Sequence, residues 1–311
     1  MKQTITSVKP FLKWAGGKTQ LLEEITKRLP IEFRKGKIKR YIEPFIGGGA
    51  LFLKVAQSYK VEKYYISDIN EDLVLAYKCV KRDVNGLIAL LRTTESTYHS
   101  LDDEERENYF YEMRTLYNKN RLIMDYTNFT TAWIERTVQI IFLNKTCFNG
   151  LFRVNSKGEF NVPFGRYKNP LICDETNLTN ISKILQNTDI RVGDFAACKN
   201  FVGEDSFVYF DPPYRPLSKT ANFTSYTNTD FNDTAQVKLA TFYRLLDKTG
   251  AKLLLSNSDP KNEDSKDNFF EDYYKEFIIQ RVKANRMINC NSEKRGPINE
   301  LLIMNYEAPL S

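Results

Sequence analysis

Residues 40–68 contain the pattern that most restricts how this chain can fold. The strand-like run Arg40–Glu43 is followed by a turn with three glycines, Gly47–Gly49, and then by a helical pattern. A second strand-like run, Tyr64–Ser67, ends at Asp68. A strand, a glycine turn, a helix, a second strand and a terminal acid form one βαβ unit. The pattern predicts an α/β fold with a doubly wound, mostly parallel sheet.

The strand pattern resumes only in the second half of the chain. Three further apolar runs are predicted to be strands: Ile190–Val192, Phe207–Phe210 and Lys252–Leu255. Such near-continuous apolar strands are typical of a parallel sheet that is covered on both faces. From about residue 71 to residue 145 the pattern is helical instead. We therefore predict a sheet domain of residues 1–70 and 172–311, interrupted by an inserted helical and hairpin domain of residues 71–171.

The predicted insertion contains two stretches of opposite charge. Residues 95–112 hold seven acids and one arginine, and a helix is expected to start near Ser100. We interpret this stretch as a solvated helix face. Residues 141–170 hold five cations, one acid and six aromatic side chains. Alternation on both sides of the turn Asn155–Gly158 predicts a β-hairpin with a partly basic face. Basic and aromatic residues together are typical of a nucleic-acid-binding surface.

Composition narrows the chemistry that the chain can perform. The 311 residues include one histidine, His99, which excludes a zinc site built mainly on imidazoles and limits histidine-based catalysis to that residue. The five cysteines form no C-x-x-C pair, so we expect no zinc ribbon and no disulfide framework. Free thiols are typical of the cytoplasm. We find no signal peptide and no membrane span, and the net charge of +6 is only mildly basic.

Two glycine-containing segments are candidates for binding a cofactor. Asp68 lies 19 residues beyond Gly49, the position from which an acid binds ribose hydroxyls in doubly wound folds. The second segment, Gly17-Lys18-Thr19, is similar to the end of a phosphate-binding loop, but Leu12 stands where that loop requires glycine. We therefore reject a nucleoside-triphosphatase. Trp14 and Lys18 remain as a wall and a cation for a small anionic group, or as a core tryptophan and a surface lysine.

The most specific motif is Asp211-Pro212-Pro213-Tyr214, which directly follows the apolar run Phe207–Phe210. Open α/β sheets bind their ligands at the carboxyl ends of strands. Two prolines fix the backbone and remove its competing N–H groups. The Asp211 carboxylate and the Pro212 carbonyl then form a rigid pair of acceptors beside an aromatic ring. This arrangement suits a planar heterocycle with an exocyclic amine.

Three motifs in chain order, Phe11–Lys18, Glu43–Gly49 and Asp211–Tyr214, resemble those of DNA adenine methyltransferases of the Dam type. The similarity continues through Phe148–Asn155 and Gly158–Tyr167 and covers nearly the whole chain. It looks closest to the members that accompany restriction enzymes cutting GATC. The resemblance implies a Rossmann-like methyltransferase fold with an inserted DNA-recognition domain.

The resemblance also implies the reaction, which is methyl transfer from S-adenosylmethionine to the exocyclic amine of adenine in duplex DNA. The lone pair of that amine is delocalised into the ring. Acceptors for its two hydrogens, at Asp211 and Pro212, would bias the nitrogen toward tetrahedral geometry. Direct in-line transfer would then need no covalent intermediate and no metal. The base must leave the double helix to reach the site.

Roles for individual residues follow from the same resemblance. The residues implied in catalysis are Asp211, Pro212, Pro213 and Tyr214. Those implied in cofactor binding are Trp14, Lys18, Phe45, Gly47, Gly49, Asp68, Asp194, Phe195 and Asp211. Those implied in DNA binding are Lys145, Asn149, Leu151, Arg153 and Tyr167. Arg153 suits bidentate contact with guanine and Leu151 suits packing on a thymine methyl. Related enzymes often carry arginine in place of Lys145, and lysine lacks the planar fork of arginine.

Three alternative functions explain less of the sequence. Cytosine C5 methylation requires a nucleophilic cysteine, and no cysteine here follows a proline as is usual in that family. Methylation of another planar amine, in glutamine or an RNA base, is the nearest enzymatic alternative, although glutamine-modifying enzymes typically carry Asn in place of Asp211. A DNA-binding regulator on an inactive methylase scaffold would not need Asp68 and Asp211. We expect a monomeric or weakly associating enzyme.

Overall fold

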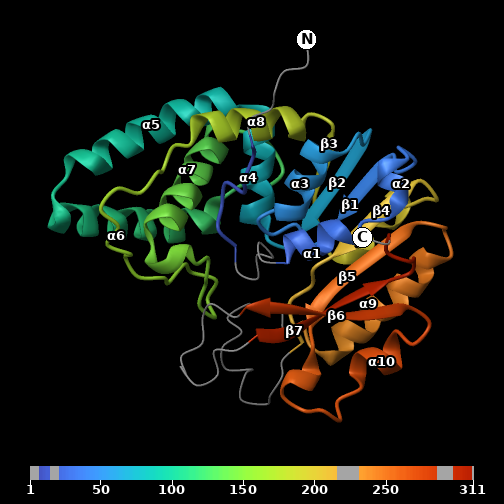
Figure 1. Cartoon of the computed structure of the whole chain (residues 1–311). Coiled ribbons are helices and arrows are strands. Elements are labelled where there is room, and N and C mark those ends of the chain that lie inside the picture. Colours follow the sequence, from blue (N-terminus) through green and yellow to red (C-terminus); the bar gives the residue numbers. More distant parts are fainter. Residues whose placement is uncertain (1–6, 15–20, 216–230, 286–296, 310–311) are drawn as a thin grey trace.

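The computed structural model describes residues 7–14, 21–215, 231–285 and 297–309 (Figure 1). Within these residues, seven strands form one sheet in the order β3-β2-β1-β4-β5-β7-β6. The strands are β1 (Arg40–Glu43), β2 (Lys63–Asp68), β3 (Thr188–Val192), β4 (Ser206–Phe210), β5 (Lys252–Ser258), β6 (Ile278–Asn285) and β7 (Pro297–Met304). The strands β1 to β5 are parallel, which confirms the predicted mostly parallel α/β sheet.

The far end of the sheet was not predicted. β7 lies antiparallel between β5 and β6, so the last two strands reverse the direction of the sheet locally. β6 is an edge strand with several partly or fully exposed residues, and its sequence therefore lacks the apolar run of a central strand. β7 has a buried apolar segment, Leu301–Met304. No described helix follows it, so it does not show the alternation of strands and helices that marks a parallel sheet.

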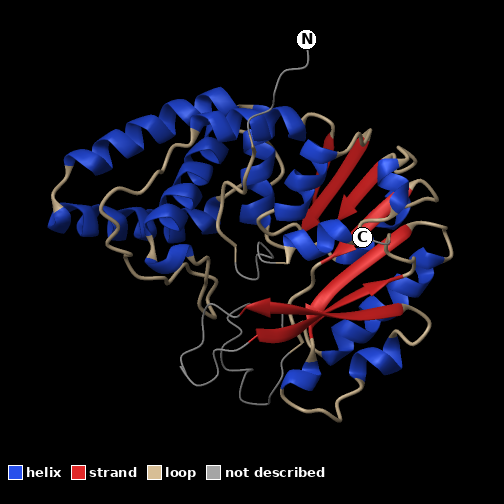
Figure 2. Cartoon of the chain, viewed as in Figure 1, coloured by secondary structure: helices blue, strands red, loops and turns tan. Residues whose placement is uncertain are grey.

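Helices cover both faces of the sheet, as Figure 2 shows. The described helices are α1 (Leu22–Lys27), α2 (Ile31–Arg34), α3 (Ala50–Ser58), α4 (Glu71–Arg82), α5 (Val84–Ser100), α6 (Asp103–Asn120), α7 (Thr131–Thr146), α8 (Glu175–Leu185), α9 (Asp233–Asp247) and α10 (Phe269–Tyr273). Successive side chains of β1 point to opposite faces, so Tyr41 packs in one core with α3, α4 and α8 and Ile42 packs in a second core with α9 and α10. The first core continues into α5 and α7.

The helices of residues 71–146 begin where polar caps place them. The Asn70 side chain accepts the Leu73 N–H at 2.9 Å and so caps the start of α4. The start of α6 differs from the prediction, because Ser100 ends α5 and Asp102 caps α6 instead. Asp102 and Glu105 form a reciprocal capping box, which satisfies two N–H groups of the first turn. The exposed acids of this turn fit the predicted solvated face.

A buried ion pair joins these helices. Arg136 of α7 is fully buried and donates through Nε and Nη2 to the two carboxylate oxygens of Asp72 of α4, both at 2.8 Å. Tyr117 of α6 and Tyr126 also donate to this carboxylate, at 2.6 and 2.9 Å. The Arg136 guanidinium lies over the Tyr117 ring at 3.5 Å. Because donors satisfy the Asp72 charge from several sides, this cluster fixes how α4, α6 and α7 cross.

The predicted hairpin is present in an irregular form. Val154 pairs with Phe160, and Cys147 pairs with Phe164, through isolated antiparallel bridges without regular strands. The turn is closed by the Gly158 N–H, which donates to the Asn155 carbonyl at 2.8 Å. The two chain segments therefore run antiparallel as predicted, but they are not held by a continuous ladder.

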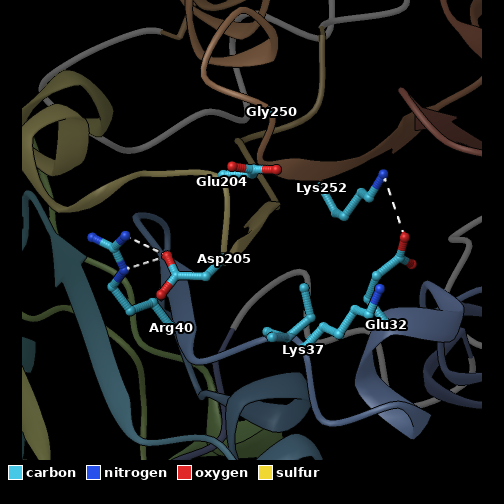
Figure 3. A pocket seen from close by; sticks show the side chains of 8 residues that line it. Glu32, Lys37, Arg40, Glu204, Asp205, Gly250 and Lys252 are labelled. Carbon is cyan, nitrogen blue, oxygen red and sulfur yellow. Dashed lines mark hydrogen bonds and ion pairs between the residues drawn. The ribbon is translucent and has the colours of Figure 1, made fainter.

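A cavity of about 540 Å³ opens at the amino ends of the strands (Figure 3). Its charged lining is largely paired, with Arg40 bonded to Asp205 at 2.8 Å and Lys252 near Glu32 at 3.5 Å. Ligands of open α/β sheets bind at the opposite, carboxyl ends. We therefore do not assign this cavity to the functional site.

Within the described ranges, the cysteines and the helices add three observations. Cys79, Cys147, Cys173 and Cys198 are unpaired and buried, and Cys290 lies outside these ranges. No helix of the described chain is long and apolar enough to cross a membrane. The same residues contain no group of three or more acids, cysteines or histidines that could hold a metal ion.

Candidate functional site

The site lies where the sheet changes its winding direction. The chain runs from β1 outward to β2 and β3, and then returns to β4 on the other side of β1. The carboxyl ends of β1 and β4 are therefore neighbours, with Ile42 opposite Val208 in the register. Glu43 ends β1 and Asp211 directly follows β4. Crevices at such a switch point bind ligands in open α/β sheets.

Asp211 is oriented by hydroxyl groups of the sheet. The Ser256 hydroxyl of β5 donates to Asp211 Oδ1 at 3.1 Å. The Tyr209 hydroxyl lies 2.8 Å from Ser256 Oγ, and both of these residues are buried. With Ser256 donating to the carboxylate, the Tyr209 O–H is left to donate to Ser256. The Ser256 and Tyr209 hydroxyls thus orient the Asp211 carboxylate. Asp211 itself is partly exposed.

The remaining residues of the Asp-Pro-Pro-Tyr turn are held by side chains rather than by a backbone ladder. Pro212 is buried, and the Pro213 carbonyl accepts the Gln236 Nε2–H of α9 at 3.0 Å. The Tyr214 hydroxyl donates to Glu300 Oε2 of β7 at 2.6 Å, and 37% of Tyr214 is exposed. Because the prolines have no N–H, these contacts replace the backbone bonds that the turn cannot make.

The glycine turn brings its backbone close to aromatic side chains. Gly47 and Gly49 have φ angles of 46° and 70°, which favour glycine. A Cβ on Gly49 would lie 2.7 Å from the Tyr77 hydroxyl, and one on Gly47 would lie 3.0 Å from Trp14. The Tyr77 hydroxyl donates to the Gly47 carbonyl at 3.1 Å. Side chains at either glycine would therefore disturb the turn.

Asp68 lies beside this turn, at the end of β2. Its carboxylate accepts the Gly47 N–H at 3.2 Å and the Asn70 N–H at 3.0 Å. Burial raises the pKa of Asp68, and the backbone N–H groups oppose that rise. A carboxylate has about four acceptor positions, so Asp68 can accept further hydroxyl groups. The structure thus brings Asp68 to the glycine turn, as an acid for ribose hydroxyls would require.

Aromatic rings form the next part of the site. Phe45 stacks on Phe195 with ring centroids 5.8 Å apart, and Phe231 contacts Phe45 edge-on at 5.6 Å. Asp194 is exposed and caps the following turn by accepting the Ala196 N–H at 3.0 Å. Phe45 and Phe195 therefore lie together although they are far apart in the sequence.

Trp14 connects the glycine turn to the hairpin. Its ring stacks on Phe152 with centroids 4.8 Å apart and an interplanar angle of 18°. The neighbouring Lys13 backbone is bound on both sides by the buried Asn144 side chain, which accepts its N–H at 2.8 Å and donates to its carbonyl at 2.9 Å. The predicted cofactor residue Lys18 lies outside the described residues.

The predicted DNA-binding residues lie along the hairpin and the helix before it. Asn149 is exposed with a φ of 57°, and 36% of Tyr167 is exposed. Leu151 is partly buried, and the Arg153 Nε donates to Asn161 Oδ1 at 2.8 Å. Burial, and then the charges of two nearby lysines, lower the pKa of Lys145. The structure thus brings Asn149, Leu151 and Arg153 onto one irregular segment.

Glu43 is a buried acid at the end of β1, near Asp211. It accepts the Tyr41 hydroxyl at 2.6 Å, and both side chains are buried. Burial raises the pKa of Glu43 well above its ordinary value, and the nearby Asp211 charge raises it further. The raised pKa disfavours a second negative charge beside Asp211.

Sequence reasoning missed the residues that hold the turn: Ser256, Gln236 and Glu300. The polar run Ser256–Asp259 directly follows the predicted strand Lys252–Leu255, so its position at a strand end was a usable signal. Glu300 is the one acid in β7 and directly precedes the apolar run Leu301–Met304, but no strand was predicted there.

A doubly wound sheet with a glycine turn, an acid at the end of β2 and a rigid acceptor turn at the end of β4 is typical of α/β proteins that bind a ligand at the carboxyl ends of their strands. The family described as D12 class N6 adenine-specific DNA methyltransferase matches residues 14–288. This chain belongs to that family. Its members act on adenine in DNA, so the protein is a DNA-modifying enzyme of the methyltransferase class.

Named relatives are similar over nearly the whole chain. The Type II methyltransferase M.MjaIII of Methanocaldococcus jannaschii is 56% identical over 96% of this chain and 99% of its own. The Type II methyltransferase M1.LlaDCHI of Lactococcus lactis subsp. cremoris is 38% identical over 96% of each chain. A DNA adenine methylase of Haemophilus influenzae is 36% identical over 94% of this chain and 92% of its own.

Proposed function

We propose that this enzyme transfers a methyl group from S-adenosylmethionine to the exocyclic amine of adenine within GATC in duplex DNA. The observation that carries the proposal is the Asp211–Tyr214 turn, which the switch point of the sheet places beside the glycine turn. Two relatives are named Type II methyltransferases, which supports a role in a restriction–modification system. The choice of GATC rests on the resemblance of residues 145–167 to the methylases of that site.

The residues around the glycine turn suit the chemistry of S-adenosylmethionine. Gly47 and Gly49 allow the positive φ angles of the turn that lies against Asp68, and Asp68 has acceptor capacity for ribose hydroxyls. Phe45 and Phe195 offer apolar ring surface for a purine. When bound, this cofactor supplies an activated methyl group. We assign Trp14, Lys18 and Asp194 to the same site as further proposals.

The chain's own contribution is to prepare the amine. Asp211 and the Pro212 carbonyl accept its two hydrogens, and Tyr214 stacks on the base that carries it. Hydrogen bonds to these acceptors bias the amine nitrogen toward tetrahedral geometry and set the direction of its lone pair. Ser256 fixes the Asp211 carboxylate for this purpose. Burial raises the pKa of Glu43 well above its ordinary value, which disfavours a second negative charge that would compete for the amine hydrogens.

We assign target choice to the inserted residues 71–171. Arg153 is proposed to read guanine, Leu151 to pack on a thymine methyl, and Asn149 and Tyr167 to orient the duplex. Lys145 contributes charge near the DNA. Asn161 holds Arg153 through its Nε, which presents a guanidinium of fixed orientation. Residues 1–70 and 172–311 then form the catalytic part.

The proposal is tested by incubating the purified protein with methyl-labelled S-adenosylmethionine and DNA duplexes with or without GATC. We expect label on adenine N6 only in duplexes that contain GATC. Label on adenine in another sequence would contradict the assigned site alone. The absence of label from every adenine would contradict the proposed activity, and label on RNA or a protein amine would support the alternatives.

A further inference from the structure

Glu300 is a buried acid that the proposed chemistry does not use. It lies in β7, opposite Ser258 of β5 and Val282 of β6, and is only 5% exposed. Burial of a carboxylate is unfavourable unless hydrogen-bond donors compensate it. The Glu300 carboxyl group at this point of the sheet therefore needs a hydrogen-bond donor.

Tyr214 supplies such a partner from the proposed active site. Its hydroxyl donates to Glu300 Oε2 at 2.6 Å. The ring itself is partly exposed, so its far end is anchored while a face stays accessible. Glu300 thus contacts the one aromatic side chain of the turn.

The backbone around Tyr214 is already fixed. Gln236 holds the Pro213 carbonyl at 3.0 Å, and the Arg215 N–H donates to Asn257 Oδ1 at 3.3 Å. The Arg215 guanidinium also pairs with Asp233 at 2.7 Å. The freedom that remains to the Tyr214 ring is rotation about its two side-chain torsions. The bond to Glu300 restricts this rotation.

We propose that Glu300 is a positioning residue, which acts through the Tyr214 hydroxyl to set the plane of the ring on which the target adenine stacks. This inference rests on the proposed function, because it assumes that Tyr214 contacts the base. Without Glu300 the ring occupies other rotamers, and the extruded adenine is aligned with Asp211 for a smaller part of the time. Methyl transfer within the bound complex then slows, whereas the affinity for the duplex, which other contacts determine, is unaffected.

A double-mutant cycle tests this coupling in the full-length enzyme with S-adenosylmethionine and a GATC duplex. We expect Glu300→Leu to lower kcat about tenfold with KM for DNA nearly unchanged, because the hydrogen bond that orients the ring is lost. Tyr214→Phe should show a similar loss, and the double variant should be no slower than either single one. Glu300→Gln keeps an acceptor and should restore part of kcat.

The comparison variant is Tyr243→Phe. This buried tyrosine donates to the carbonyls of Leu253 and Ile303 and does not touch the turn, so kcat should stay unchanged. A Glu300→Leu loss that persists in the Tyr214→Phe background would overturn the inference, as would a Tyr214→Phe variant with wild-type kcat. If instead the wild-type enzyme labels no adenine, the proposed function itself fails.

Discussion

The turn at the end of β4 and the hairpin of residues 147–167 are built in opposite ways. The turn follows a regular parallel strand, and side chains of β5, β7 and α9 hold it. The hairpin has only isolated bridges, with positive φ angles at Asn149 and Arg166. It depends on α6, where the Asn118 side chain accepts the Phe160 N–H at 2.8 Å, and on the Trp14–Phe152 stack. We infer that the rigid element performs the chemistry and the irregular one chooses the target.

The largest expected effect comes from the acceptor at the strand end. Asp211→Ala should lower kcat at least about a hundredfold, because a preorganised group at the reacting atom is lost. Steady-state methylation of a GATC duplex measures this effect. Asp211→Asn should also be strongly impaired, since its amide presents hydrogens to the amine.

Circular dichroism should show both Asp211 variants folded. A folded Asp211→Ala enzyme with more than a tenth of the wild-type kcat would show that the chemistry does not reside at the end of β4.

The second prediction concerns the support of the hairpin side. Asp72→Ala leaves the fully buried Arg136 without its carboxylate and should lower the free energy of unfolding by about 3–5 kcal/mol. The exposed pair Arg166–Glu107 offers the matched control, where Glu107→Ala should cost about 0–1 kcal/mol. Urea unfolding curves measure both values. Equal small losses in the two variants would mean that the buried cluster does not hold these helices together.

The smallest predicted effect is a change in the pH dependence of stability when Glu43 is replaced. Burial raises the folded-state pKa of Glu43 above its ordinary 4.5, so this group favours folding below that pH and loses its contribution as the pH rises toward the folded pKa. Glu43→Gln cannot ionise. Its free energy of unfolding relative to the wild type should therefore increase with pH above about 4.5. A relative stability that is constant between pH 4 and 8 would place a charged Glu43 in the folded protein.

The same contrast explains what could be predicted from the sequence. The strands β1, β2 and β4 have short apolar runs, with a proline shortly after β1 and β4, so their ends and the site residues Asp68 and Asp211 were predictable. Continuous apolar runs carry this information because both faces of these strands are buried.

The residues that hold the site were harder to predict. Gln236 and Glu300 act across elements that are distant in the sequence, and β7 joins the sheet in the reverse direction. The hairpin was predicted from alternation, but its irregular backbone depends on tertiary contacts such as those of Trp14 and Asn144. Local patterns do not encode such contacts.

The division between chemistry and target choice is tested most directly by one ratio. Single-turnover methylation rates are measured on a GATC duplex and on a duplex with one altered base pair, for Ser256→Ala and Arg153→Ala. Ser256→Ala removes a donor to Asp211, so it should lower the methylation rates of both duplexes by the same factor and keep the wild-type ratio of the two rates. Arg153→Ala should reduce the ratio by about 1–3 kcal/mol of discrimination. An unchanged ratio in Arg153→Ala, or an equal drop in Ser256→Ala, would contradict the division.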